Sequence, residues 1–146
     1  MTEISPHSGF IKEGIHHFSI RVYYEDTDLG GVVYYANYLK FMERARSEML
    51  RKLGIDQAEM LEYNDPEDVS FVVKRAEIDF NSPAKYDDQL VVKTGIIKVG
   101  GASLLIRQDI TKEGQILVTG NIKAASIGIE GKAKRLPKAV KEKLKL

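Results

Sequence analysis

Residues 17–24 alternate between apolar and polar side chains with a period of two. The apolar positions are Phe18, Ile20, Val22 and Tyr24, and the polar or amphipathic ones are His17, Ser19, Arg21 and Tyr23. Successive side chains of a β-strand point to opposite faces, so this pattern predicts a strand with one face in the core.

Residues 37–53 follow a helical period instead. Apolar side chains recur there at steps of three and four: Leu39, Met42, Ala45, Met49 and Leu53, with Tyr38 and Phe41 widening the stripe. Gly54 follows two basic residues and is a natural helix stop. A helix of this length with one apolar stripe needs an apolar surface to lie on.

Four further runs typical of strands come after a turn-rich link at residues 55–68. They are residues 69–80, 89–99, 102–112 and 115–129. The short connections at Gly100-Gly101 and Glu113-Gly114 favour antiparallel hairpins. The order of elements predicts an α+β fold in which one long helix lies on the concave face of a curved, antiparallel, five-stranded sheet.

The two ends of the chain lack this regularity. Residues 1–14 have no periodicity and are expected to form a loose leader, and residues 131–146 form a basic tail with a short helix after Pro137. The tail suits nucleic acid, anionic lipid or a CoA phosphate, but a solvated tail is the commoner explanation, and we expect no nucleic-acid binding. At 146 residues and 43% hydrophobic content, we expect a single domain spanning residues 1–146.

The composition excludes several classes of site. The chain has no Cys, which rules out disulfides and cysteine nucleophiles. Adjacent His16 and His17 would point to opposite faces of a strand, so we expect no metal site. No GxxxxGK[ST], GxGxxG, GxSxG or HExxH motif occurs, and we expect no cofactor. No apolar run reaches membrane-spanning length and no signal peptide is visible, so a cytoplasmic protein without a membrane span is expected.

The chemistry is concentrated between the first strand and the helix. Asp28 precedes Gly30 and Gly31, which let the backbone pass close to a ligand. The helix that follows presents unpaired N–H groups and the positive end of its dipole to a carbonyl oxygen that becomes negative during reaction. A carboxylate beside amide donors suits acyl transfer, whereas the alternative interpretation is a solvated turn before a helix.

Several motifs here resemble a known family. Arg21-Val22, Asp26-Thr27-Asp28, Gly31-Val32-Val33-Tyr34-Tyr35 and Asn37-Tyr38 are similar to the signature of the 4-hydroxybenzoyl-CoA thioesterase family. The run from Arg21 to Asp28 and the Glu43-Arg44-Ala45-Arg46 motif resemble its bacterial Tol-Pal-associated acyl-CoA thioesterase subgroup. The resemblance spans roughly residues 18–136 and implies the hotdog fold, in which a curved sheet wraps the helix and two subunits pair their sheets.

The resemblance also implies roles for individual residues. Asp28, rather than Asp26, would be the catalytic carboxylate, and the backbone N–H of Tyr35 would polarise the thioester carbonyl. The Tol-Pal subgroup usually has histidine at position 35, whereas the hydroxybenzoyl branch has tyrosine, so no imidazole is available here. Gly30 and Gly31 would lie beside the substrate.

The hairpin at residues 100–103 is where the hydroxybenzoyl branch carries arginines that clamp the CoA phosphate. Here Gly100, Gly101 and Ala102 stand in their place. The amides of Gly101 and Ser103 are therefore our candidate phosphate contacts, with Lys98 and the basic tail as alternatives.

The leading hypothesis is an acyl-CoA thioesterase in which Asp28 acts as nucleophile or as general base. The alternatives are an acyl-carrier-protein thioesterase and a non-catalytic hotdog module that binds acyl-CoA or a protein of the Tol-Pal system. Long strands with open edges predict a homo-oligomer, and the family resemblance suggests a dimer of dimers. The preferred acyl group is not visible in the sequence.

Overall fold

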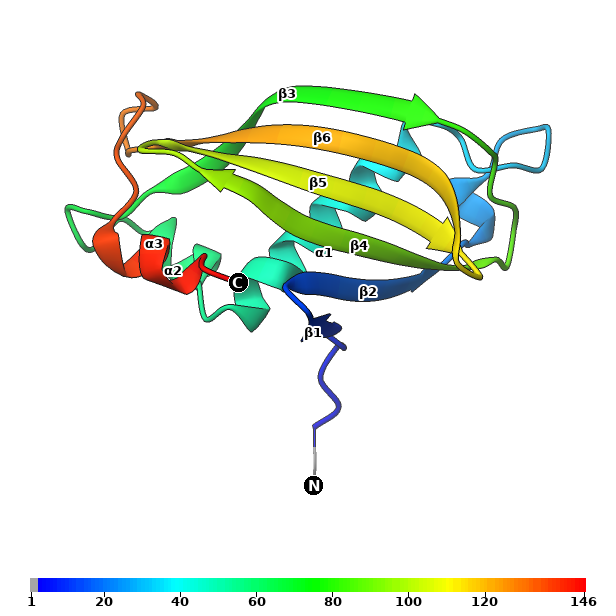
Figure 1. Ribbon diagram of the computed structural model, residues 1–146, viewed down its shortest axis with the longest axis horizontal. Helices are drawn as coiled ribbons and strands as arrows, with labels where there is room; N and C mark the ends of the chain where they lie inside the picture. The colour runs from blue at the N-terminus through cyan, green and yellow to red at the C-terminus, as the bar shows by residue number, and fades with distance from the viewer. Residues whose placement is uncertain (1–2) are drawn as a thin grey trace.

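The computed structural model describes residues 3–146 and contains one six-stranded antiparallel sheet, with strand order β1-β2-β4-β5-β6-β3. The strands are β1 (Phe10–Lys12), β2 (Ile15–Arg21), β3 (Ser70–Phe80), β4 (Gln89–Val99), β5 (Ser103–Lys112) and β6 (Gln115–Ile127). The helices are α1 (Asn37–Lys52), α2 (Gln57–Met60) and α3 (Lys138–Lys143). The sheet curves around α1, as Figure 1 shows. The predicted arrangement of one long helix against a curved antiparallel sheet is confirmed.

Helix α1 packs on the sheet through the stripe that the sequence predicts. Its buried residues are Asn37, Tyr38, Phe41, Met42, Ala45, Met49 and Leu50. Met42 lies so close to β6 that a Cβ on Gly120 would stand 2.9 Å from its Cε, which explains a glycine in the middle of a strand. Gly54 follows the helix with φ +82°, a left-handed position that favours glycine. Leu39, predicted on the apolar stripe, is instead 45% exposed.

Two hairpins join the central strands. Glu113 and Gly114 both have positive φ, 49° and 83°, as the tight turn between β5 and β6 requires. The turn between β4 and β5 has three residues, 100–102, and Gly100 N–H donates to the Ser103 carbonyl at 2.8 Å. Register shifts at Ile96/Lys98 in β4 and at Val73/Arg75 in β3 are bulges, which bend strands and so curve the sheet around α1.

The sheet has six strands rather than the predicted five. The additional strand, β1, lies in the segment expected to be a loose leader and pairs with β2, Phe10 facing His17 and Lys12 facing Ile15. A Glu13-Gly14 turn with φ of 51° and 77° connects them. This is the same dipeptide as Glu113-Gly114, but β1 has only three residues, too few to show a period of two.

The first predicted strand also ends earlier than its apolar pattern suggests. β2 stops at Arg21, and Tyr24–Asp26 form a single 3₁₀ turn in which Tyr24 is exposed. His16, outside the predicted strand, lies in β2 and is fully buried. Beyond Arg21 the pairing continues for one residue outside the sheet: the Val22 N–H donates to the Asp88 carbonyl and the Val22 carbonyl accepts from the Asp87 N–H, both at 2.9 Å, and both partners precede β4.

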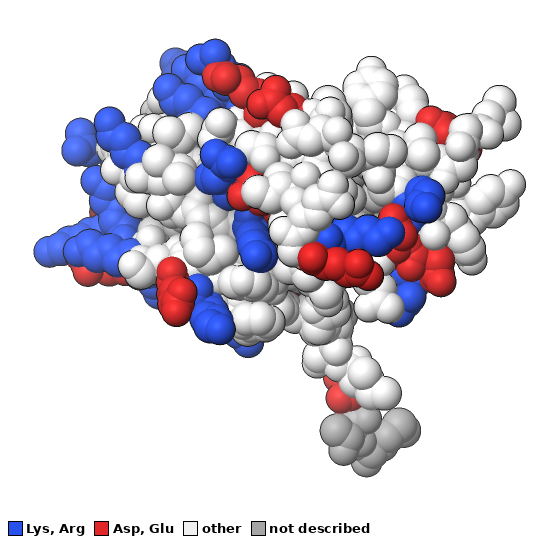
Figure 2. Space-filling view, turned by 45° about the vertical axis from the view of Figure 1, so that its right-hand side comes forward, with Lys and Arg blue, Asp and Glu red and all other residues white. Residues whose placement is uncertain are grey.

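The basic C-terminal segment is packed against the rest of the chain. The predicted short helix is confirmed as α3, which presents Val140 to the core, and Leu136 and Leu144 on either side of it are buried as well. Four of its lysines are exposed, whereas Lys134 and Lys141 are partly buried. Figure 2 shows Lys and Arg side chains crowded at the left-hand end of the molecule, where Figure 1 places α3.

Candidate functional site

The segment between β2 and α1 is held in place by Asp26. Its Oδ2 accepts a hydrogen bond from the Tyr23 N–H at 2.8 Å. Its carbonyl accepts from the Tyr34 N–H at 2.9 Å and from the Asn37 Nδ2 at 2.9 Å. Asp26 therefore ties the end of the first strand segment to the start of the helix, and its carboxylate is occupied by the backbone.

Asp28 begins the tight turn that follows. Its N–H donates to the Val32 carbonyl at 2.9 Å, and its carbonyl accepts from the Gly31 N–H at 3.0 Å. Gly31 has φ +79°, which favours glycine at this position. The Gly30 N–H donates to Asp28 Oδ1 at 2.8 Å. One oxygen of the exposed Asp28 carboxylate is thus oriented by the turn, and Oδ2 accepts no hydrogen bond within residues 3–146.

The start of α1 leaves donors unsatisfied. Within residues 3–146 the N–H groups of Tyr35 and Ala36 donate to no acceptor, whereas the Asn37 N–H donates to the Tyr34 carbonyl at 2.8 Å. Ala36 precedes the helix and supplies no side-chain cap, and the first turn has no acidic residue. The positive end of the helix dipole and two free amides are therefore available to an oxygen atom of a ligand.

The ring of Tyr35 packs on an aromatic group rather than on the carboxylate. It meets Phe80 edge to face at 5.8 Å between ring centroids, and the buried ring of Tyr38 also lies 5.8 Å from Phe80. The Tyr38 hydroxyl accepts from the Ala84 N–H at 3.0 Å, and burial raises the pKa of Tyr38. These contacts fix the end of β3 and the loop after it against the start of α1.

Asp28 and the start of α1 border one open hollow of about 700 Å³. The turn contributes Thr27, Asp28 and Leu29 to it, and the helix start contributes Ala36, Asn37 and Lys40. The predicted carboxylate thus borders the same hollow as Ala36, the residue that follows the predicted donor Tyr35, whereas Tyr35 itself does not line it. Lys40 was not predicted; its signal is its position one helical turn after Ala36 and Asn37.

Gly101 and Ser103 do not join this group within one chain. They lie at the β4–β5 turn, at the opposite end of β4 from the loop that precedes α1 (Figure 1). β4 has 11 residues, so its ends are about 33 Å apart at 3.3 Å per residue.

The β4–β5 turn is covered instead by the C-terminal segment. The Leu136 N–H donates to the Gly101 carbonyl at 2.8 Å, and a Cβ on Gly101 would lie 3.9 Å from the guanidinium carbon of Arg135. The hairpin and the basic tail, predicted as alternative phosphate contacts, are therefore neighbours. Arg135 itself was missed, because the sequence marks the tail as basic without showing which residue lies over the turn.

The histidines do not form a metal site. His16 is fully buried, with Nε2 2.6 Å from the Ser8 carbonyl, whereas His17 stacks on Phe10 at 4.9 Å. No cluster of three or more His, Asp or Glu side chains suited to a metal ion occurs within the described part of the chain. Among the helices of residues 3–146, none is long and apolar enough to cross a membrane.

Comparison with known proteins identifies the family. The thioesterase superfamily model matches residues 30–119, which include the turn after Asp28 and all of α1. The chain belongs to the thioesterase superfamily. The family that the sequence motifs indicate is thereby confirmed.

Similar proteins support this assignment over most of the chain. The acyl-CoA thioesterase YbgC of Haemophilus influenzae is 45% identical over 126 residues, which cover 85% of this chain and 90% of that protein. The acyl-CoA thioester hydrolase YbgC of Escherichia coli O6:H1 is 39% identical over 83% of this chain and 89% of that protein. A crystal structure described as a probable thioesterase from Bartonella henselae has a TM-score of 0.80 and 43% identity, covering 84% of this chain and 99% of that one. The fold is the hotdog fold predicted from the sequence.

Proposed function

We propose that this chain hydrolyses acyl-CoA at the hollow between Asp28 and the start of α1. That it is an acyl-CoA thioester hydrolase follows from its family and its YbgC relatives. The roles of the residues are our proposal. The observation that supports it is that Asp28, whose carboxylate is oriented by Gly30, and Ala36 border one hollow, and that the N–H groups of Ala36 and of the preceding Tyr35 have no acceptor within residues 3–146.

In the proposed reaction the thioester carbonyl oxygen accepts a hydrogen bond from the Tyr35 N–H. The helix dipole adds to this stabilisation as negative charge develops on that oxygen. Asp28 either attacks the carbonyl carbon or removes a proton from an attacking water. The carbon–sulfur bond then breaks, and CoA leaves as the thiolate and takes up a proton. If Asp28 is the nucleophile, loss of the thiolate leaves the acyl group on Asp28 as a mixed anhydride, which water then hydrolyses to the acid and free Asp28. If Asp28 is the base, the attacking water supplies one oxygen of the acid directly.

The two routes differ in where the new oxygen first appears. In a single turnover in ¹⁸O-water, a nucleophilic Asp28 whose anhydride is hydrolysed at the Asp28 carbonyl would transfer one of its own unlabelled oxygens to the product and retain ¹⁸O in its carboxylate. A general base would place ¹⁸O in the product at once. By mass spectrometry, an unlabelled acid together with ¹⁸O in the peptide that contains Asp28 would identify the nucleophilic route.

The phosphates of CoA are proposed to meet Arg135 and the amides of Gly101 and Ser103. The separation of about 30 Å between the β4–β5 turn and the hollow, estimated from strand rise, means that a second chain must supply one of them. β3 is an edge strand of 11 residues with half-exposed Val72 and Val73, and unpaired edges of this kind are completed by another strand. We therefore propose a homodimer formed through β3, with a dimer of dimers as the full assembly.

An acyl carrier protein is the alternative acyl donor, and the basic end favours it. Residues 131–146 contain seven Lys or Arg and one Glu, and they surround α3 at one end of the molecule. An acidic carrier would be attracted to that surface. Comparison of kcat/KM for the same acyl group on CoA and on a carrier protein decides between the two donors.

The test of the proposed function is thiol release from a panel of acyl-CoA chain lengths and from hydroxybenzoyl-CoA, with wild-type protein and with Asp28→Asn. We expect turnover by the wild type that Asp28→Asn loses. Binding of acyl-CoA without any turnover by the wild type would instead identify a binding module.

A further inference from the structure

Arg46 places a guanidinium between α1 and the sheet. Its Nη1 donates to Gln108 Oε1 at 3.0 Å. Gln108 is fully buried, and its Nε2 donates to the Met42 carbonyl and to Thr94 Oγ1, both at 3.0 Å. These bonds fix the Gln108 amide with its oxygen towards Arg46. A guanidinium has five N–H donors, and only one of them is used within residues 3–146.

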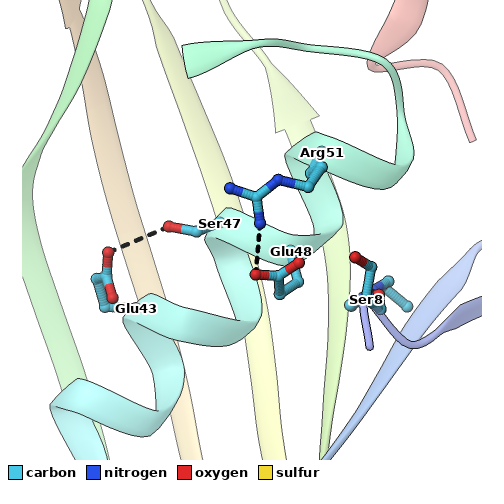
Figure 3. Close-up of polar contacts among 6 residues, drawn as sticks. Ser8, Glu43, Ser47, Glu48 and Arg51 are labelled. Atoms are coloured by element: carbon cyan, nitrogen blue, oxygen red, sulfur yellow. Dashed lines mark hydrogen bonds and ion pairs between the residues drawn. The ribbon is translucent and has the colours of Figure 1, made fainter. Parts of the chain in front are cut away.

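Arg46 forms no ion pair within residues 3–146, although the negative charge of Glu43 acts on it at longer range and partly offsets the effect of burial on its pKa. Burial lowers the pKa of Arg46, and no Asp or Glu in the described chain forms a salt bridge with it. The nearby Glu43 is exposed, and its Oε1 accepts from the Ser47 hydroxyl at 3.1 Å, as Figure 3 shows. A partly desolvated cation without a partner is unfavourable, so an anionic ligand would stabilise it.

A cavity of about 150 Å³ adjoins this guanidinium. Its apolar wall comes from α1, β3, β5 and β6: Leu50, Phe71, Val72, Val73, Leu104, Ile106 and Ala124. Val72 and Val73 also lie on the edge strand proposed to form the homodimer, so the cavity adjoins that interface. A cavity of about 150 Å³ in another protein holds benzene, so this volume admits a ligand of roughly six to eight non-hydrogen atoms. The border of the cavity carries the Arg46 cation, the exposed Glu43 carboxylate and the polar side chains of Ser47 and Gln57. The site thus combines a small apolar wall with a polar border that includes one cation.

We propose that this cavity binds the free carboxylate of a short aliphatic acid. The carboxylate would accept two parallel hydrogen bonds from Arg46, and the hydrocarbon would lie on the apolar wall. Arg46 lies 11 residues beyond Tyr35, about 16 Å along the helix at 1.5 Å per residue, so this site is separate from the hollow at Asp28. The ligand belongs to the chemical class that thioester hydrolysis releases, but the inference rests on Arg46 and the cavity alone.

Direct binding to the full chain tests the proposal without requiring turnover. Sodium valerate is titrated by calorimetry, with valeramide as the uncharged ligand of matching shape and dodecanoate as the ligand that is too long. Arg46→Met removes the cation at similar size, and Ala124→Val fills the cavity without touching Arg46. Arg44→Met is the matched control, because it removes the same charge from an exposed position on the same helix.

We expect valerate to saturate wild type with a dissociation constant below about 10 mM. Arg46→Met and Ala124→Val should weaken binding at least tenfold, Arg44→Met less than twofold, and valeramide and dodecanoate should bind at least tenfold more weakly than valerate. Circular dichroism checks that each variant folds. If Arg46→Met fails to fold, Ala124→Val decides the question.

Three results would overturn the proposal. The first is the absence of saturable valerate binding to wild type, and the second is unchanged binding in whichever of the two cavity variants folds. The third is equal binding of valeramide and valerate.

If valerate does not bind and Arg46→Met converts the assembly to monomer in light scattering, the cation serves an interface between copies of the chain instead. Loss of turnover in Asp28→Asn bears only on the proposed catalysis.

Discussion

The two ends of the sheet differ in which backbone groups have hydrogen-bond partners. At the Asp28 end, a glycine turn leads into α1, and the amides of Tyr35 and Ala36 stay without an acceptor in the described chain. At the β4–β5 end, the turn carbonyls already accept hydrogen bonds, since the Ser126 N–H of β6 donates to Ala102 and the Leu136 N–H of the C-terminal segment donates to Gly101. The first end offers backbone donors and a carboxylate, and the second offers side-chain cations.

We expect the Asp28 end to catalyse the reaction and the β4–β5 end to bind the phosphates of the substrate. Free backbone amides are rigid and close to the helix dipole, which suits a charge that develops only in the transition state. Exposed arginine and lysine side chains are mobile, and they suit a phosphate that is charged throughout the reaction. Changes at the Asp28 end should therefore lower kcat, and changes at the Arg135 end should raise KM.

The largest effect is expected for Asp28→Asn. The change keeps the shape and the oxygen that accepts from Gly30, but it removes the nucleophile or base, so kcat should fall at least ~10²-fold, about 2.7 kcal/mol. Asp26→Asn is the matched control, because its amide oxygen can still accept from the Tyr23 N–H. Thiol release measured for both variants decides the matter, and an inactive Asp26→Asn beside an active Asp28→Asn would move the catalytic group two residues upstream.

A smaller effect on a different constant is expected for Arg135→Gln. Loss of one exposed phosphate contact should raise KM for acyl-CoA roughly three- to tenfold, about 1 kcal/mol, with kcat unchanged. Lys145→Gln, which removes a charge paired with Glu142 at the end of the same segment, should leave KM within twofold. A fall in kcat with constant KM for Arg135→Gln would show that Arg135 contributes to the reaction rather than to phosphate binding.

Tyr35→Phe should change activity by less than about tenfold. The proposed donor is the main-chain N–H, which remains, and the ring keeps its contact with Phe80. The loss of kcat in Tyr35→Phe should be compared with the loss in Asp28→Asn, measured under the same conditions. If Tyr35→Phe loses as much as Asp28→Asn, the phenol takes part in the reaction, and the backbone-donor assignment fails.

The smallest effect concerns folding and lies between the two ends, at His16. Burial lowers the pKa of His16, so the unfolded chain binds the proton more readily than the folded chain. The stability that this provides is complete above the unfolded pKa of about 6.5 and is lost as pH falls below it. Urea unfolding of wild type should show a lower midpoint at pH 5.5 than at pH 7.5, and His16→Gln should reduce that difference. An equal pH dependence in both proteins would contradict this origin.

Glu48 and His16 should affect folding stability in different pH ranges. The hydrogen bond from Arg51 and the charges of Arg51 and His7 lower the pKa of Glu48 despite its partial burial. Because a depressed carboxyl pKa gives stability that disappears only below the unfolded value, Glu48 acts below about pH 4.5 and His16 acts above that.

Much of the fold was predictable, because its long elements have clear periods. The helix at residues 37–52 and the four later strands lie within two residues of their predicted bounds. β1 was missed because three residues carry no period, although the Glu13-Gly14 turn before β2 is the same signal as Glu113-Gly114. The proximity of Asp28 to the start of α1 was predictable because fewer than ten residues separate them.

The sequence by itself determined the local elements, the faces they bury and the turn that carries Asp28, because these depend on side-chain period and on the φ angles that glycine allows. Only the tertiary structure decided which distant residues meet: Arg135 over Gly101, Arg46 with Gln108, and Ser8 with His16. A periodic pattern specifies that a face is apolar, but it does not specify its partner. That choice depends on strand order, on bulges and on the packing of α1 against the whole sheet.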